Sequence, residues 1–309
     1  MKIAAVQMMA DFGNVEQNLK KSKQLAEEAF LDGAEMVILP EFFTTAMGFH
    51  SKMIGTAQPW DGKPMKLLRN LAAKYQGIIG GSYIAIREND AYNTFVLTFP
   101  DGSTFFHDKD QPTMWENCYY KGGIDDGVLA TDLSNFGVAL CWEFVRTRTV
   151  KRMINRVDTV IGGSCWWTLP EKRLRGFPQE LNYKNIEIMQ ETPARFAKML
   201  GVHVIHAAHA GFFEGNMPLM SNFAYKSHYL GETQIVDGTG KILRRMTRED
   251  GEGHVLADID IKEKWSPSES IPNGFWIPKL PVQLRFAWWY QNRHGRRYYR
   301  KKIRPHLFK

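Results

Sequence analysis

The chain has 309 residues, 44% of them hydrophobic and 24% charged, which is the composition of an ordinary globular protein and excludes a disordered or fibrous one. No apolar run is long enough to cross a membrane, and the first residues lack the apolar core of a secretion signal. Three cysteines without CxxC spacing argue against a disulfide framework or a thiolate metal site, so we expect a reducing, cytoplasmic location.

The formal charge of +7 is unevenly distributed along the chain. Ten of the 40 Lys and Arg residues, and no acidic residue, lie in residues 276–309, so that 30 basic residues oppose 33 acidic ones in the rest of the chain. We therefore expect two parts: a mildly acidic domain at residues 1–275 and a basic, aromatic-rich extension at residues 276–309.

In chain order, the first half predicts a buried strand, an amphipathic helix, a second buried strand, a helix, a strand and a β-hairpin. An Asp-Gly pair ends the first helix, and Pro-Asp-Gly forms the turn of the hairpin. These elements are predicted at residues 2–8, 14–31, 36–40, 65–75 and 77–86, with the hairpin formed by 92–99 and 103–109.

The second half repeats this order, with strand, helix, strand, helix, strand and a hairpin that turns at an Asp-Gly pair. Strands that alternate with helices, with hairpins added, predict an α/β fold in which helices cover a sheet. The elements of the second half are predicted at residues 136–141, 149–157, 159–167, 191–200, 202–210 and 232–246.

Three chemically reactive residues follow the ends of predicted strands: Glu41, Lys109 and Cys141. Each alone has a commoner explanation, namely a surface carboxylate, a solvated amine and an inert core cysteine. Because neighbouring strand ends converge, however, the three side chains can share one pocket. There the carboxylate can take the proton of the thiol, and the ammonium can stabilise the negative charge that develops on the attacked group.

The segments that carry these residues, LPEFF, HDKDQPTMWE and GVALCWEF, resemble the Glu, Lys and Cys motifs of the nitrilase superfamily of carbon–nitrogen hydrolases in order and spacing. The similarity extends over roughly residues 1–262. It implies a four-layer α-β-β-α sandwich, dimers that stack sandwich on sandwich, and a catalytic set of Glu41, Lys109 and Cys141. It also implies that Glu116 orients the lysine, although a structural salt bridge would explain Glu116 nearly as well.

Residues that follow two strand ends in the second half are candidates for substrate binding. The backbone N–H of Trp142 would be a second donor to the developing charge. Cys165 matches a position that lines the substrate pocket in the family, and Trp166 would narrow that pocket, stack on a ligand or pack at a dimer surface. For Cys118 and Glu143 we expect structural roles.

Three histidines, His203, His206 and His209, are spaced by three residues and could suggest a metal site. On a strand this spacing puts successive side chains on opposite faces, so we expect no metal there. The chemistry that the resemblance implies needs no organic cofactor either.

The interpretation that we favour is a thiol hydrolase of a non-peptide carbon–nitrogen bond in a small amide or N-carbamoyl compound. An acyl-enzyme on Cys141 would release ammonia or an amine and then a carboxylic acid. LPEFFTT and GGSY resemble amidases and carbamoylases, whereas KDQPTMWE and CWEF resemble nitrilases, so conversion of a nitrile to the acid and ammonia is the alternative. Acyl transfer to an amine is a third outcome.

The extension at residues 276–309 lies outside the resemblance. Its aromatic and arginine content suits a subunit contact, and we expect a homodimer or a higher homo-oligomer. The same composition also suits an anionic membrane surface or nucleic acid. A non-catalytic scaffold that binds one of these is the remoter alternative for the whole protein.

Overall fold

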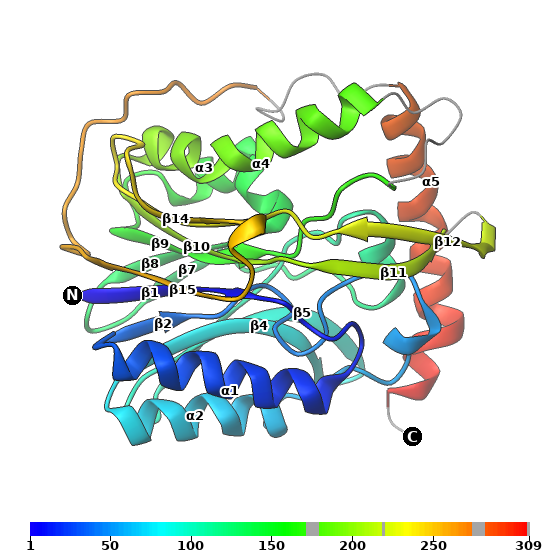
Figure 1. The fold of residues 1–309 in the computed structure, drawn as a ribbon, viewed down its shortest axis with the longest axis horizontal. Coiled ribbons are helices and arrows are strands. Elements are labelled where there is room, and N and C mark those ends of the chain that lie inside the picture. The colour runs from blue at the N-terminus through cyan, green and yellow to red at the C-terminus, as the bar shows by residue number, and fades with distance from the viewer. Residues whose placement is uncertain (171–178, 218–219, 274–281, 308–309) are drawn as a thin grey trace.

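The computed structural model describes residues 1–170, 179–217, 220–273 and 282–307 (Figure 1). Helices α1 (Val15–Leu31) and α2 (Lys63–Tyr75) lie on one side of the strands, and α3 (Thr147–Met153) and α4 (Gln179–Leu200) lie on the other. Two layers of strands lie between these pairs of helices. The expected α/β fold, a four-layer α-β-β-α sandwich, is therefore confirmed.

The strands form a continuous hydrogen-bonded network whose main path runs β6-β5-β4-β2-β1-β10-β9-β8-β7. At its centre β1 pairs in parallel with β2 and β10, so the two halves of the chain meet there. The strands are β1 (Lys2–Met8), β2 (Met36–Ile38), β3 (Gln58–Pro59), β4 (Ile78–Arg87), β5 (Asp90–Thr98), β6 (Thr104–Asp108), β7 (Val128–Ala130), β8 (Asn135–Leu140), β9 (Thr159–Ser164), β10 (His203–His209), β13 (Gly231–Val236), β14 (Ile242–Thr247) and β15 (Gly253–Asp258), with β11 (Phe212–Met217) and β12 (Met220–His228) as a separate hairpin.

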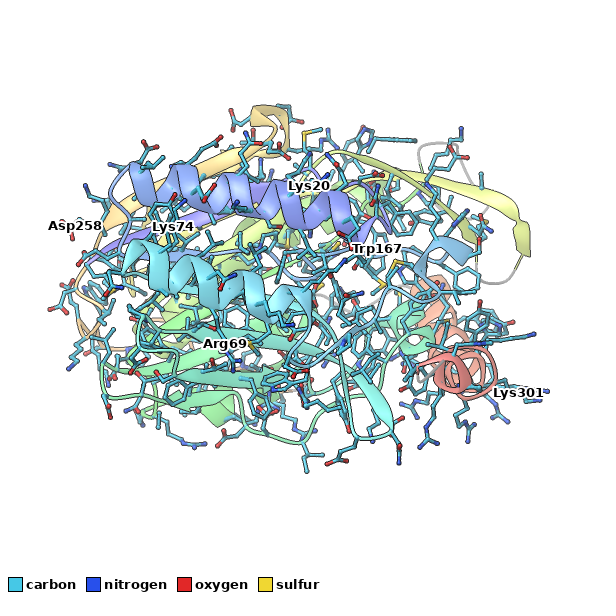
Figure 2. The ribbon with its side chains drawn as sticks, turned by 90° about the horizontal axis from the view of Figure 1, so that it is seen from below. Lys20, Arg69, Lys74, Trp167, Asp258 and Lys301 are labelled. Carbon is cyan, nitrogen blue, oxygen red and sulfur yellow. The ribbon has the colours of Figure 1, made fainter. Side chains whose placement is uncertain are left out.

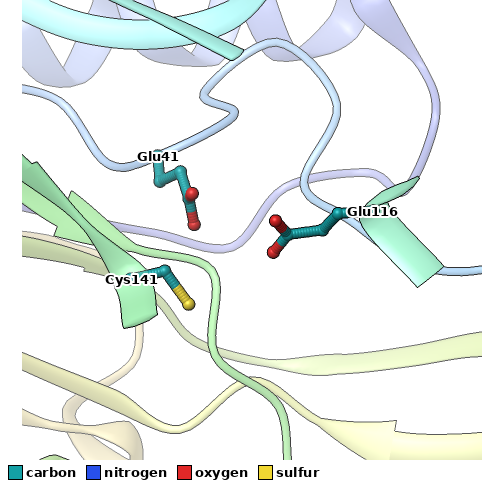
Figure 3. Close-up of side chains that lie close together, drawn as sticks. All are labelled: Glu41, Glu116 and Cys141. Carbon is teal, nitrogen blue, oxygen red and sulfur yellow. The ribbon is translucent and has the colours of Figure 1, made fainter. Parts of the chain in front are cut away.

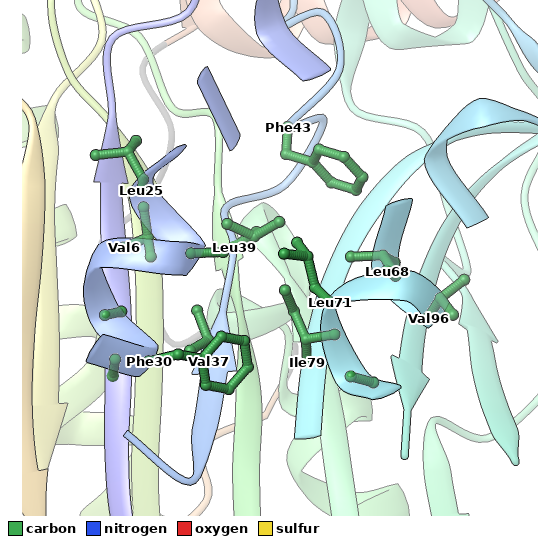
Figure 4. Packing of buried hydrophobic residues seen from close by; sticks show 14 of the residues in the cluster. Val6, Leu25, Phe30, Val37, Leu39, Phe43, Leu68, Leu71, Ile79 and Val96 are labelled. Atoms are coloured by element: carbon green, nitrogen blue, oxygen red, sulfur yellow. The ribbon is translucent and has the colours of Figure 1, made fainter. Parts of the chain in front are cut away.

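Helix α1 has the amphipathic character that its sequence predicts, and it belongs to one of the outer helical layers of the sandwich. The side chain of Asn14 caps it by accepting a hydrogen bond from the N–H of Gln17 at 3.3 Å. Its apolar residues, including Leu25 and Phe30, are buried against the sheet (Figure 4), whereas Lys20 on α1 and Lys74 on α2 point outward (Figure 2). The apolar face of the helix thus covers one side of the strands.

Two predicted helices have different ends in the structure. The one predicted over residues 149–157 is α3, which ends at Met153, and Asn155 has a left-handed φ of 60° that a right-handed helix cannot accommodate. The one predicted over 191–200 is the second half of α4, whose earlier turns are polar and whose interior contains Pro193. Asn155 thus makes α3 end before the predicted residue 157, whereas the polar turns and the proline had argued against a helix as long as α4.

The strands that deliver the candidate residues also end earlier than predicted. β8 ends at Leu140, so Cys141 begins a short 3-10 helix, η3 (Cys141–Val145). β9 ends at Ser164, so Cys165 and Trp166 lie beyond the strand. The predicted strand ends thus become turns, and these turns carry the reactive side chains.

Part of the predicted extension forms helix α5 (Val282–Tyr298), which crosses one end of the sandwich (Figure 1). It lies against the 3-10 helix η2 (Met114–Cys118), where Nδ2 of Asn117 donates a hydrogen bond to Oδ1 of Asn292 at 2.9 Å. Residues 276–281, 308 and 309 lie outside the described residues. Among the helices of the described residues, none is long and apolar enough to span a bilayer.

Candidate active site

The side chains of Glu41, Lys109, Glu116 and Cys141 meet in the interior, and Figure 3 shows the two carboxylates facing the sulfur. Nζ of Lys109 lies 2.8 Å from Oε1 of Glu41 and 2.8 Å from Oε2 of Glu116. One carboxylate oxygen of each glutamate and Sγ of Cys141 all lie within 4.8 Å of one another. The convergence that the sequence predicted for Glu41, Lys109 and Cys141 is therefore present, with Glu116 on the opposite side of the lysine.

Three turns bring these side chains together, and each contains a non-glycine residue with left-handed φ. The φ angles are 54° at Phe42, 50° at Met114 and 51° at Cys141. Such a backbone conformation costs roughly 1–3 kcal/mol and persists only where surrounding contacts enforce it. For Cys141 the result is a sharp turn from strand β8 into η3, which directs the sulfur toward the two carboxylates.

Glu41 follows strand β2, and three groups hold its carboxylate. Oε1 accepts hydrogen bonds from Nδ2 of Asn93 and Nζ of Lys109, both at 2.8 Å, and Oε2 accepts one from the N–H of Cys165 at 3.0 Å. Burial raises the pKa of Glu41 to about 7, although the positive charge of Lys109 acts in the opposite direction. Near neutral pH this carboxyl group can both accept and return a proton.

Lys109 is fully buried between its two carboxylates. Burial disfavours the charge, but the negative charges of Glu116 and Glu41 outweigh it and raise the pKa of Lys109 above its ordinary value. An ammonium has three N–H donors, and the two glutamates use two of them. Within the described part of the chain, the side chain is therefore a fixed cation whose third donor is available to a ligand.

The two carboxylate oxygens of Glu116 differ in their hydrogen bonding. Oε2 accepts hydrogen bonds from Lys109, from the N–H of Thr113 at 2.8 Å and from the hydroxyl of Tyr120. Oε1 is buried without a hydrogen-bond partner among the described residues. A buried carboxylate oxygen without a partner is costly, so this atom is suited to accept a hydrogen bond from a bound molecule.

The sulfur of Cys141 is almost completely buried. Burial, together with the negative charge of Glu41, raises the pKa of Cys141 well above its ordinary value, although Lys109 and the backbone N–H of Trp142 oppose this shift. The resting group is therefore a thiol, and its use as a nucleophile requires a base within reach. A carboxylate oxygen of Glu41 lies within 4.8 Å of this sulfur.

A second buried network lies behind the site and is centred on Glu143. Its carboxylate accepts hydrogen bonds from the N–H groups of Leu140 and Asp110, both at 2.9 Å, and lies 3.1 Å from Nε2 of His107. Burial opposes the charge on His107, but Glu143 and Asp125 outweigh it and raise the pKa of His107 to about 10. Glu143 thus connects Asp110, which follows Lys109, to Leu140, which precedes Cys141.

The histidines of strand β10 contact different parts of the protein. Nε2 of His209 lies 2.8 Å from the backbone oxygen of Glu41, whereas His206 contacts Oγ of Ser164 at 3.1 Å. Burial lowers the pKa of both histidines to about 4, so they are neutral. Among the described residues, the group of His, Cys, Asp and Glu close enough to share a metal ion is Glu41, Glu116 and Cys141, where Lys109 already supplies a positive charge.

Two of the predicted substrate-binding residues, Trp142 and Trp166, belong to the same buried cluster as Cys141. Cys165 is fully buried, and its N–H is bound to Glu41. The rings of Trp142 and Trp166 lie 5.7 Å apart, and Nε1 of Trp166 donates a hydrogen bond to Asn185 at 2.9 Å. Their roles in binding remain predictions, as does the subunit contact predicted for the extension, whose described helix lies against its own chain.

Sequence reasoning missed several residues that hold the site. Asn93 and His209 lie on strands and Tyr120 lies after η2, and all three are buried. The signal that could have found them is a polar residue within a run that is otherwise suited to the core, because a buried polar group needs a partner. The partners themselves come from distant segments, which the local pattern does not reveal.

Comparisons with known proteins agree with this geometry. The model of the carbon–nitrogen hydrolase family matches residues 2–264. A 2-oxoglutaramate amidase from Bacillus subtilis is 25% identical over 276 residues, which cover 87% of this chain and 95% of the relative. A cyanide hydratase from Aspergillus niger is 23% identical over 283 residues, covering 85% and 79%.

Solved structures show the same fold. A carbon–nitrogen hydrolase from Helicobacter pylori superposes with a TM-score of 0.70 at 18% identity, covering 84% of this chain and 89% of the other. An amidase of the nitrilase superfamily from Nesterenkonia AN1 superposes with a TM-score of 0.64 at 16% identity, covering 84% and 90%. At these identities the likeness concerns the fold.

Proposed function

The chain belongs to the carbon–nitrogen hydrolase family, and from this premise we propose that it hydrolyses a small amide through a covalent intermediate on Cys141. One observation carries the proposal: the buried ammonium of Lys109 lies 2.8 Å from each of two carboxylates, beside a buried thiol. A base, a cation and a nucleophile at these separations are what acyl transfer to a thiol requires.

In the first half of the reaction, Glu41 takes the proton of Cys141 and the sulfur attacks the amide carbon. The electron pair of the carbonyl bond moves to the oxygen, where the third N–H of Lys109 and the N–H of Trp142 stabilise the negative charge. The intermediate then collapses, the carbon–nitrogen bond breaks, and the nitrogen takes the proton from Glu41 and leaves as ammonia or an amine.

In the second half, Glu41 takes a proton from water and the resulting hydroxide adds to the thioester carbon. The carbon–sulfur bond breaks, the acid leaves, and Cys141 recovers its proton. The pKa of Glu41 at about 7 supports both directions of transfer. Oε1 of Glu116, which has no partner among the described residues, would accept a hydrogen bond from the substrate nitrogen.

Hydrolysis of a nitrile is the second candidate, and a cyanide hydratase and a nitrilase from Pyrococcus abyssi among the relatives support it. The thiol would add to the nitrile carbon, the nitrogen would take the proton, and two waters in sequence would give ammonia and the acid. We place amide hydrolysis first because the relative that the chain matches over 95% of its length is an amidase.

The test is release of ammonia from panels of amides, N-carbamoyl compounds and nitriles, with the Cys141→Ala and Cys118→Ala variants side by side. Both cysteines are buried, so the pair separates loss of the nucleophile from loss of packing. We expect release from an amide by wild type and Cys118→Ala and none by Cys141→Ala. Release that persists in Cys141→Ala would remove the mechanism, and release from nitriles alone would favour the second candidate.

A further inference from the structure

We propose that helix α5 forms one wall of the substrate pocket, and that Trp288 determines specificity by holding the indole of Trp142 next to the nucleophile. The wall would restrict the protein to amides with small, uncharged acyl groups. This inference rests on the proposed function and names its substrate class. It also gives the C-terminal extension a role within its own chain.

The contact between α5 and the site is an aromatic one. The ring of Trp288 stacks on that of Trp142, with 4.9 Å between the centroids and an interplanar angle of 22°. Trp142 directly follows Cys141 and is 7% exposed, and the ring of Trp166, which is 5% exposed, also contacts it, with 5.7 Å between the centroids. A buried ring that contacts two others cannot turn away to admit a larger group without a change in one of them.

Three further contacts fix the helix at this place. Asn292 accepts a hydrogen bond from Asn117 at 2.9 Å, and a Cβ on Gly295 would lie only 2.6 Å from that of Asn117. Beyond the helix, the hydroxyl of Tyr299 accepts a hydrogen bond from the N–H of Ala91 at 2.8 Å. Because Asn117 directly follows Glu116, the helix is attached to the segment that carries a candidate catalytic carboxylate.

The chemistry of this wall indicates the class of acyl group. Cys141, Trp142 and Trp166 belong to one buried hydrophobic cluster, and Met114 and Trp288 pack against it. The charge of Lys109 is already balanced by two carboxylates. A negatively charged acyl group would therefore lose its hydration against an apolar wall, whereas a small uncharged group would not.

The decisive test measures access to the thiol without any turnover. Iodoacetamide and its bulkier N-benzyl analogue are reacted separately with the protein, and adducts on the peptide of Cys141 are quantified by mass spectrometry. In each reaction the carbon–sulfur bond forms, iodide leaves with the electrons of the carbon–iodine bond, and the thiol proton is released to the buffer. The quantity of interest is the ratio of the bulky to the small reaction rate.

Trp288→Ala should raise this ratio by about tenfold or more, the order of discrimination that an apolar pocket provides. Trp289→Ala is the matched control, because Trp289 is adjacent on the same helix and 57% exposed, and it should leave the ratio unchanged. Trp288→Phe, which keeps a stacking ring, should stay near wild type. Gly295→Val, which forces the helix away from Asn117, should act like Trp288→Ala.

A ratio that is the same in wild type, Trp288→Ala and Gly295→Val would overturn the inference, and so would an equal increase in Trp289→Ala. Hydrolysis of acetamide and phenylacetamide gives the parallel measurement, in which Trp288→Ala should improve kcat/KM for the larger amide relative to the smaller. If wild type released no ammonia from amides or nitriles, the proposed function would fail, while the alkylation ratios would still decide whether α5 forms the wall.

Discussion

Nδ2 of Asn93 donates a hydrogen bond to Oε1 of Glu41 at 2.8 Å, and this is the same oxygen that accepts a hydrogen bond from Lys109. Two donors therefore stabilise the ionised form of a carboxyl group whose burial favours the neutral form. The balance between these effects sets the pH at which Glu41 is ionised and available as a base.

Replacement of Asn93 by Ala should move the pH dependence of the reaction. Because a hydrogen bond to the carboxylate is lost, the pKa of Glu41 should rise, by about one unit if the bond is worth about 1.4 kcal/mol. The measurement is kcat/KM from pH 5 to 9. Thr98→Val is the control, since Thr98 is buried on the same strand and its hydroxyl has no partner among the described residues. An unmoved profile in Asn93→Ala would contradict the assignment of Glu41 as the base.

The wild-type profile should have a single acidic limb. The carboxylate form of Glu41 is the active one, so kcat/KM should increase about tenfold per pH unit up to an apparent pKa of about 7 and then remain level. The pKa values of Cys141 and Lys109 are raised, so we expect neither group to lower the rate below about pH 9. A rising limb centred near the ordinary thiol pKa would instead indicate attack by a preformed thiolate.

Replacement of Lys109 by Met should reduce both activity and stability. Two buried carboxylates would lose their shared cation, which should cost roughly 3–5 kcal/mol, and kcat should fall by at least about 100-fold. The folded-state pKa of Glu41 should rise further, so the loss of stability relative to wild type is small at about pH 5, where the carboxyl is protonated in both proteins, and grows as the pH rises through about 7 to 8. Urea unfolding at both pH values measures this, with Lys74→Met as an exposed control.

Replacement of Glu143 by Gln tests the network behind the site. In the wild type the N–H groups of Leu140 and Asp110 each donate to a carboxylate oxygen of Glu143. The side-chain amide of Gln would place its own N–H group where one of these oxygens lies, and it would leave the charged His107 without one of its negatively charged partners. We expect a loss of roughly 3–5 kcal/mol in the free energy of unfolding. Glu16→Gln removes one partner of an exposed ion pair and should cost less than about 1 kcal/mol. Equal effects of the two variants would show that Glu143 has no special structural role.

Much of the candidate site could be predicted because the residues next to Glu41, Lys109 and Cys141 in the sequence already indicate strand ends. Glu41, Lys109 and Cys141 each end a run with strand periodicity, and strand ends meet at a sheet edge. The hairpin of β5 and β6 was equally accessible, because Pro-Asp-Gly stands between two strand-like runs. At these positions the local sequence pattern alone indicates the structure that forms.

The remainder depends on contacts between distant segments. Asn93 reaches Glu41 across 52 positions, and Tyr299 reaches Ala91 across 208. The pairing of Trp288 with Trp142 likewise follows from where α5 lies after folding, which its own composition does not specify. The subunit contact that the aromatic, basic composition of the tail predicts stays a prediction, and the described helix of the tail also contacts Trp142 of its own chain.

The measurement that tests the account most directly is identification of the covalent intermediate. Wild-type protein is mixed with an amide that it hydrolyses, quenched in acid within the first turnovers, digested and analysed by mass spectrometry. We predict an acyl group on the peptide that contains Cys141, absent from Cys141→Ala and present in Cys118→Ala. An acyl group on Cys165 or Cys118 instead, or turnover of the amide by Cys141→Ala, would contradict the account.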